Sequence, residues 1–422
     1  MLDSMQSALG LVVLTGIAWA LSEQRSAISW GIVRNGLLTQ FIIALALLKV
    51  TAFQDAFAIL NSVVVALVDA TRTGTSFVFG YIGGGEAPFV MLDETRSTFV
   101  LAFESLPLIL VISAISGLLF HWKVLPPIVN AFAWALQRMM GVNGPVGMAV
   151  TLNVFVGQTE APILVRPYLK SETRAGLFVI MTAGMGTVAG SVMLLYVTFL
   201  DGIIPNPLGH ILTASLISAP AAIMVALLMI PESPSDTRKT SLTNVELPSR
   251  DGGNAMSAIT RGTLEGVQLV INIVAMLIVL VALVALANMV IGLLPDVNNA
   301  PLTLQRILGW LMAPVAWLIG IPWSEAVTAG SLLGTKTILN ELIAYIELSQ
   351  LPSDMLSARS RLILTYAMCG FANLASIGIG IGALATMVPE RRTDIIDLMP
   401  RALVSGTITT LLTGAMVGVI SG

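Results

Sequence analysis

Two polar interruptions inside apolar sequence carry the residues best suited to chemistry. The first covers residues 157–162, Gly-Gln-Thr-Glu-Ala-Pro, and the second runs from residue 334 to a carboxylate at Glu341. A carboxylate at membrane depth is costly and is kept there mainly where it faces a cavity or a partner. Each interruption is therefore a candidate binding site, and two of them in corresponding places indicate a transporter with internal repeats.

The composition places the whole chain in a membrane. Of its 422 residues, 56% are hydrophobic and only 11% are charged, and the mean hydropathy is +0.89. This leaves too little polar surface for a soluble protein of that size. The long apolar runs match helices of about 20 residues rather than the alternating strands of a barrel. The sequence therefore predicts an all-α polytopic membrane protein.

Charge and residue counts exclude several other classes of protein. A net charge of -3 without a basic tract argues against a nucleic-acid partner. Cys369 is the single cysteine, and His121 and His210 are the only histidines, so neither an internal disulfide nor a metal cluster is expected. A membrane-embedded enzyme would need a cluster of His, Cys or Asp, and a channel would need a continuous polar stripe. We therefore expect neither an enzyme nor a channel.

The apolar runs predict several membrane helices and one helix at the membrane surface. The first, over residues 9–21, is expected to be retained because no basic region precedes it. Residues 52–79 mix apolar and polar side chains, which is typical of an interfacial helix. Residues 81–86 form a loop, and the linker 231–254 is predicted to be disordered. The remaining predicted crossings end at residue 49 or cover residues 99–119, 173–200, 210–230 and 264–294.

Two half-length apolar pieces flank the first interruption, over residues 146–156 and 161–168. Each is too short to span the bilayer, so together they predict a re-entrant hairpin with residues 157–160 at its tip.

The same pattern returns in the second half of the chain. Three pairs correspond in order: Ala133-Trp134 with Ala316-Trp317, Gly157 and Tyr168 with Gly334 and Tyr345, and residues 184–190 with residues 370–376. Each glycine-rich stretch is expected to unwind its helix beside a hairpin tip and free backbone groups for binding. The repeat must be inverted, because a single central helix carries the chain across between its two copies.

The basic residues predict the orientation. If both termini face outward, the inward segments carry about two-thirds of the 21 Lys and Arg residues. We divide the chain into scaffold helices with an interfacial helix (1–122), a first transport repeat (123–231), a linker with the central scaffold helix (232–300) and a second transport repeat (301–422).

Several of these motifs resemble a known family. Residues 157–162, Gly334-Thr335-Lys336 with Leu339-Asn340-Glu341, residues 369–373 and residues 389–392 are similar to motifs of the concentrative nucleoside transporters of bacterial type. The resemblance implies eight membrane helices, two re-entrant hairpins, interfacial helices and a homotrimer whose scaffold holds a mobile transport domain, as in an elevator mechanism. It also implies sodium-coupled symport of nucleosides across the bacterial inner membrane into the cell, with both termini periplasmic.

The resemblance assigns roles to particular residues. Gln158, Thr159 and Glu160 would face the base, Glu341, Asn373 and Ser376 would hold the ribose, and Phe371 and Val192 would pack against the ring. Sodium would be held by the side chains of Asn153 and Thr187 and by the backbone carbonyls of Val156 and Val188. The family usually has an aromatic residue at the position of Leu374 and Gln at that of Gly380, so the preference for a base stays open.

Simpler interpretations compete with some of these roles. Thr159 would equally cap a helix, Asn373 and Ser376 would bond helix to helix, and Phe371 would fill the core. These alternatives do not suit Glu160 and Glu341, because the only nearby cation in sequence is Lys336. Proton coupling through one of the two carboxylates is the nearer rival to sodium coupling.

Overall fold

The computed structural model describes residues 2–90, 98–158, 160–232, 254–297 and 300–421. Within these residues the regular structure is helical, apart from one isolated β-bridge between Val297 and Ala300. Seven of the described helices are long and apolar enough to cross a membrane, and the number is eight if one bent pair counts as a single span. The prediction of an all-α polytopic membrane protein is confirmed.

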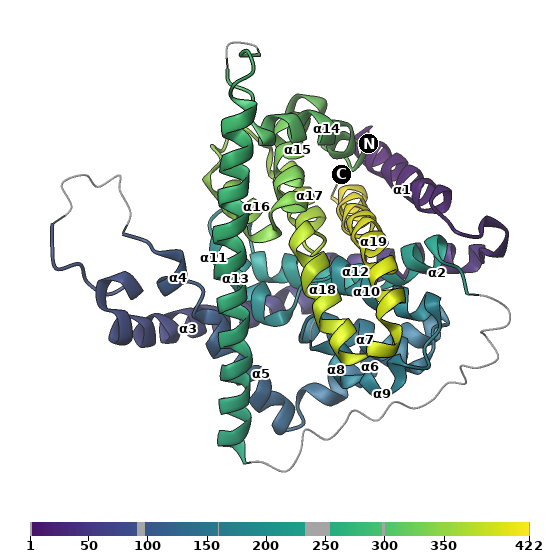
Figure 1. The fold of residues 1–422 in the computed structure, drawn as a ribbon, viewed down its shortest axis with the longest axis horizontal. Helices are drawn as coiled ribbons and strands as arrows, with labels where there is room; N and C mark the ends of the chain where they lie inside the picture. Colours follow the sequence, from purple (N-terminus) through teal and green to yellow (C-terminus); the bar gives the residue numbers. More distant parts are fainter. Residues whose placement is uncertain (1, 91–97, 159, 233–253, 298–299, 422) are drawn as a thin grey trace.

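The first part of the chain supplies α1 to α6 and two short 3₁₀ turns. Their bounds are α1 Leu2–Ala20, η1 Arg25–Ala27, α2 Trp30–Lys49, α3 Thr51–Phe79, η2 Gly80–Gly83, α4 Leu101–Glu104, α5 Leu108–His121 and α6 Leu125–Met140. Figure 1 shows α3 lying across the direction of the long helix α13 and reaching away from the body of the molecule, as an interfacial helix does. The predicted crossing over 99–119 is divided at Pro107 into α4 and α5.

The two repeats follow, separated by α13. The first begins with α6 and continues with α7 Gly144–Phe155, α8 Ala161–Leu164, α9 Arg166–Leu169, α10 Arg174–Gly186, α11 Gly190–Leu200 and α12 Pro207–Met229. The second contains α14 Leu304–Leu318, α15 Trp323–Ile338, α16 Glu341–Gln350, α17 Ala358–Met368, α18 Leu374–Met387, η3 Pro389–Arg391 and α19 Arg392–Ile420. Between them α13 covers Ala255–Ile291 and so begins nine residues before the predicted 264. Most of the predicted linker 231–254 lies outside the described residues.

Glycines fix the packing of α13 against α5. Gly262 and Gly266 are separated by one helical turn and lie directly on α5: a Cβ added to Gly262 would stand 2.3 Å from the carbonyl oxygen of Ser113, and one added to Gly266 2.9 Å from Cα of Leu110. Small residues at this spacing let two membrane helices approach backbone to backbone. The rest of α13 is mostly exposed and apolar, including Ile278 and Leu286.

The helices of the two repeats form the buried core, and their ends show which segments share a side. Most of α10, α12 and α19 is buried. Figure 1 shows both chain termini toward the end of α13 that finishes at Ile291, opposite the end that begins at Ala255. At the other end of the bundle, Arg174 bridges Glu23 (3.2 Å) and Asp397 (2.5 Å). The termini and the loop after α13 therefore lie on one side, and this charged cluster on the other.

Candidate functional site

The first re-entrant hairpin is built by α7, the tip and the short helices α8 and α9. Asn143 caps α7, because its side-chain oxygen accepts from the N–H of Val146 at 2.9 Å. At the tip Gly157 has φ +111°, a conformation that side chains with a Cβ rarely adopt. A Cβ there would also stand 2.8 Å from Cβ of Ala189. Glycine is thus needed both for the turn and for its close contact with the neighbouring broken helix.

The second hairpin is built by α15 and α16 and turns at Leu339 and Asn340. Asn340 caps α16 by accepting from the N–H of Ile343 at 2.9 Å, which places Glu341 on the first turn of that helix. Gly334, which matches Gly157 in the sequence repeat, does not lie at the turn of its hairpin. It stands inside α15, and the turn comes five residues later. The first arm of this hairpin, α15, has 16 residues, whereas α7, the first arm of the first hairpin, has 12. When the two hairpins are aligned at their tips, Gly157 and Gly334 therefore occupy different positions.

Each hairpin tip lies beside a broken helix, as predicted. Residues 187–189 separate α10 from α11, and residues 369–373 separate α17 from α18. The second break also touches the last turn of α10, since a Cβ on Gly370 would stand 3.0 Å from the carbonyl oxygen of Met185. Four helix ends and two hairpin tips therefore meet in the middle of the fold, where backbone groups are released from regular helices.

A cavity of about 390 Å³ opens at this meeting point. Such a volume is in the usual range for a small-molecule site. Seven of the eight predicted substrate residues line it, namely Gln158, Glu160, Val192, Glu341, Phe371, Asn373 and Ser376. The eighth, Thr159, lies outside the described residues. The cavity thus collects side chains from both hairpins and from both broken helices.

Glu341 is the most tightly held polar group of the cavity. It is only 4% exposed, and each carboxylate oxygen accepts one hydrogen bond, from the hydroxyl of Tyr196 at 2.6 Å and from the side-chain N–H of Asn373 at 3.0 Å. Asn373 is itself fixed, because its oxygen accepts from the N–H of Ser376 at 2.9 Å and caps α18. A carboxylate has about four acceptor sites, so two remain for hydroxyl donors of a ligand.

The four predicted sodium ligands come from the end of α7 and from the break after α10. Asn153, near the end of α7, is 1% exposed, and its Oδ1 has no hydrogen-bond partner among the described residues. Thr187 and Val188 belong to the break after α10, where the Ser215 hydroxyl donates to the carbonyl of Val188 at 3.1 Å. The hydroxyl of Thr187 donates to the carbonyl of Ala183 at 2.8 Å, which leaves its lone pairs available. A buried oxygen without a hydrogen-bond partner is what a cation site shows when no ion is bound to it.

Comparison with known proteins identifies the family. Models described as the C-terminus and N-terminus of Na⁺-dependent nucleoside transporters match residues 210–418 and 9–82, and a model described as a nucleoside-recognition gate matches residues 102–202. The uncharacterized transporter YutK of Bacillus subtilis is 35% identical over 97% of this chain and 98% of its own. The chain belongs to the concentrative nucleoside transporter family. It is a multi-pass membrane transporter and not an enzyme.

Two further relatives agree with this assignment. The rat sodium/nucleoside cotransporter 1 is 33% identical over 99% of this transporter and 64% of its own length. The solved structure of CNTnw in an inward-facing substrate-bound state is 34% identical, covers 100% of this chain and 98% of its own, and superposes with a TM-score of 0.89. The agreement extends over the whole fold, both hairpins included.

The transporter's cavity also contains residues that the sequence analysis did not select. Tyr196, one turn after Val192 on α11, is fully buried against Glu341. The wall formed by α13 contributes Glu265, Gln268 and Asn272. Their spacing puts these three polar side chains on one face of an otherwise apolar helix, which is a signal that the sequence does carry.

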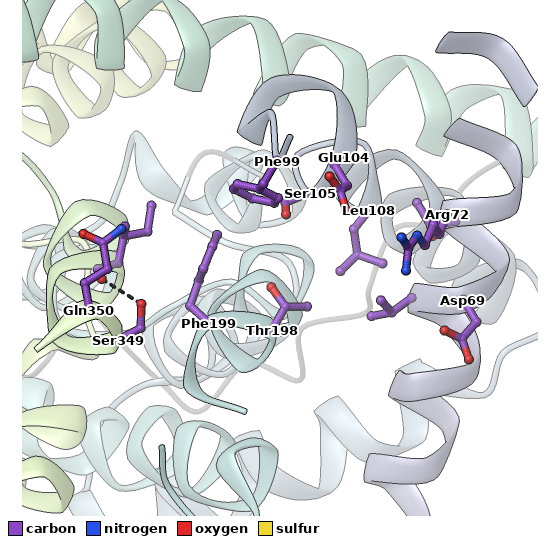
Figure 2. Close-up of a pocket in the computed structure, with 13 residues that line it drawn as sticks. Asp69, Arg72, Phe99, Glu104, Ser105, Leu108, Thr198, Phe199, Ser349 and Gln350 are labelled. Carbon is purple, nitrogen blue, oxygen red and sulfur yellow. Dashed lines mark hydrogen bonds between the residues drawn. The ribbon is translucent and has the colours of Figure 1, made fainter. Parts of the chain in front are cut away.

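A second cavity, of about 430 Å³, lies at the far ends of two helices that line the first. Figure 2 shows Phe199 and Thr198 from the end of α11 and Ser349 and Gln350 from the end of α16. The opposite wall comes from α3 to α5, where Glu104 and Arg72 are found. This cavity therefore lies between the predicted scaffold helices and helices of the predicted transport repeats.

Proposed function

We propose that this transporter is a sodium-coupled symporter that carries nucleosides into the cell, with the cavity at the hairpin tips as its substrate site. The observation that supports this most strongly is the convergence of the predicted residues on one cavity around a buried, doubly hydrogen-bonded carboxylate. The rat relative is named as a sodium/nucleoside cotransporter, which favours the same ion and substrate here.

The two ends of a nucleoside need different chemistry, and the cavity offers both. Glu341, Asn373 and Ser376 hold the ribose, because a carboxylate with free acceptor sites suits vicinal hydroxyl donors. Gln158, Thr159 and Glu160 bind the polar edge of the base.

The apolar part of the site holds the flat ring. Phe371 and Val192 pack against the base, since both line the same cavity as Glu341.

Sodium is held in this proposal by Asn153, Thr187 and the carbonyls of Val156 and Val188. These are oxygen ligands without a dedicated carboxylate, which suits a monovalent hard cation. The bound ion supplies one positive charge. Its ligands lie beside the hairpin that carries Gln158, so binding the ion also holds that tip in place for the nucleoside.

One sodium per nucleoside is energetically sufficient. One charge moving through about 100 mV contributes roughly 2.3 kcal/mol, and a tenfold concentration gradient adds about 1.4 kcal/mol. Together they support an accumulation of several hundred-fold.

Transport follows from moving this site across the membrane. The two repeats form the moving domain, while α13 with α3 to α5 belongs to a scaffold that assembles as a homotrimer in the bacterial inner membrane. The apolar, exposed length of α13 offers surface to lipid and to neighbouring copies. Both termini are periplasmic, because the opposite side carries the charged cluster of Arg174.

Proton coupling remains the second candidate, because Glu160 and Glu341 are two of the three carboxylates that line the cavity. Calorimetry of uridine binding to the purified transporter separates the two. Affinity should rise with sodium at constant ionic strength, and Asn153→Ala and Thr187→Ala should remove that rise. Thr198→Ala is the matched control, because its hydroxyl also donates to a carbonyl of its own helix but lies away from the break. An affinity that ignores sodium and responds only to pH would favour the proton.

A further inference from the structure

Lys336 is a buried cation in the second hairpin that the proposed mechanism does not yet use. It lies in α15 and is 2% exposed, and its ammonium group donates to the hydroxyl of Thr410 at 3.2 Å. A hydroxyl alone does not compensate a buried charge, because taking an ammonium out of water costs several kcal/mol. Glu341, the acidic residue nearest to Lys336 in sequence, lies five residues later on the first turn of α16 and is also buried.

The inverted repeat gives this position a counterpart. Lys336 is the third residue from the end of α15, and Asn153 is the third residue from the end of α7. Each therefore lies at the same place on the first arm of its hairpin, just before the tip.

The surroundings of the two residues also correspond. In the first repeat the Ser215 hydroxyl of α12 contacts the break at Val188. In the second repeat Thr410 of α19 packs on the break at Gly370, where an added Cβ would stand 2.5 Å from its methyl carbon. In both repeats a hydroxyl residue of the last helix thus contacts the broken helix, and Thr410 also accepts from Lys336.

We infer that Lys336 is a tethered cation that occupies, in the second hairpin, the position that sodium takes in the first, and that it serves as the fixed counter-ion of Glu341. This inference rests on the proposed sodium site for its comparison. It assigns Lys336 the role of a positioning residue, whose charge balances that of Glu341 when the carboxylate accepts from ribose. One consequence is that the second hairpin takes no ion of its own, so a single mobile sodium accompanies each nucleoside.

A double-mutant cycle on the full-length transporter tests the pairing. Uridine affinity is measured by calorimetry, at one fixed sodium concentration, for wild type, Lys336→Gln, Glu341→Gln and the double variant. We expect each single variant to bind at least tenfold more weakly and the double variant to bind within about threefold of Glu341→Gln. Independent effects would multiply to at least a hundredfold, since they add as free energies.

Specific controls separate pairing from loss of structure. Lys49→Gln removes an exposed lysine and should leave the affinity unchanged. Melting temperatures are compared as well, because removing one member of a buried pair is more harmful than removing both. The double variant should therefore melt higher than Lys336→Gln, even if the single variant folds too poorly to bind.

Three results would overturn the inference. They are normal binding by Lys336→Gln, fully multiplicative losses in the double variant, or a double variant no more stable than Lys336→Gln. The sodium dependence of wild-type affinity gives an independent readout, with a Hill coefficient near one expected and one near two contradicting a single mobile ion. A wild-type affinity that does not change with sodium would instead contradict the proposed sodium coupling. The double-mutant cycle would still test the pairing of Lys336 with Glu341 independently.

Discussion

Replacing Glu341 with Gln removes the charge at the centre of the cavity while keeping the side chain's shape. Two of its acceptor sites are occupied by Tyr196 and Asn373, so in our account the remaining two face the ribose hydroxyls. A hydrogen bond to a charged acceptor is worth about 1.5 to 3 kcal/mol, and losing one of that size weakens binding roughly ten- to a hundredfold. Glu341→Gln should therefore bind uridine at least tenfold more weakly.

The assay should also show which part of the ligand is affected. Calorimetry with uridine and 2′-deoxyuridine should find a clear preference for uridine in the wild type and a much smaller one in Glu341→Gln. Glu347→Gln is the matched control, because it makes the same change on the same helix at a residue that does not line the cavity. If Glu341→Gln binds uridine normally, or keeps the full preference for uridine, then this carboxylate does not hold the ribose.

Three further outcomes are expected. In uptake assays, Asn153→Ala combined with Thr187→Ala should abolish stimulation by sodium; stimulation that persists would remove both from the ion site. Gly157→Ala should lower uridine affinity by at least tenfold, because its φ is +111° and a Cβ would stand 2.8 Å from Cβ of Ala189. The control Gly378→Ala, where an added Cβ has nothing within 4 Å, should leave the affinity unchanged. Equal affinities of the two variants would show that the tip tolerates a side chain. In whole cells an impermeant thiol reagent should label single cysteines placed at the carboxyl terminus and in the loop after α13. It should not label single cysteines placed in residues 231–254. The opposite labelling pattern would reverse the orientation.

Local chemistry explains why so much of the site could be predicted from the sequence. Gly157, Glu160 and Glu341 stand out because glycine, proline and carboxylate are costly inside apolar sequence, so they mark the hairpins directly. The glycine-rich stretch at 184–190 marks a break in a helix for the same reason. The seven predicted residues that share the cavity all belong to such interruptions or to the helical turn beside them.

Other features depend on contacts that no local pattern encodes. Tyr196 reaches Glu341 from 145 positions away, so its role follows only once α11 and α16 are side by side. Gly334 does not lie at a tip as Gly157 does, because it stands inside the longer first arm of the second hairpin. The early start of α13 at Ala255 accompanies its packing against α5, where Gly262 meets Ser113 and Ala258 meets Gly117.

Uptake of radiolabelled uridine into proteoliposomes, with sodium and proton gradients imposed separately, tests the central claim most directly. The account predicts accumulation when sodium is directed inward, further enhancement by an inside-negative potential, and no accumulation with a proton gradient alone. Uptake that is indifferent to sodium and collapses when the proton gradient is removed would contradict sodium-coupled nucleoside transport.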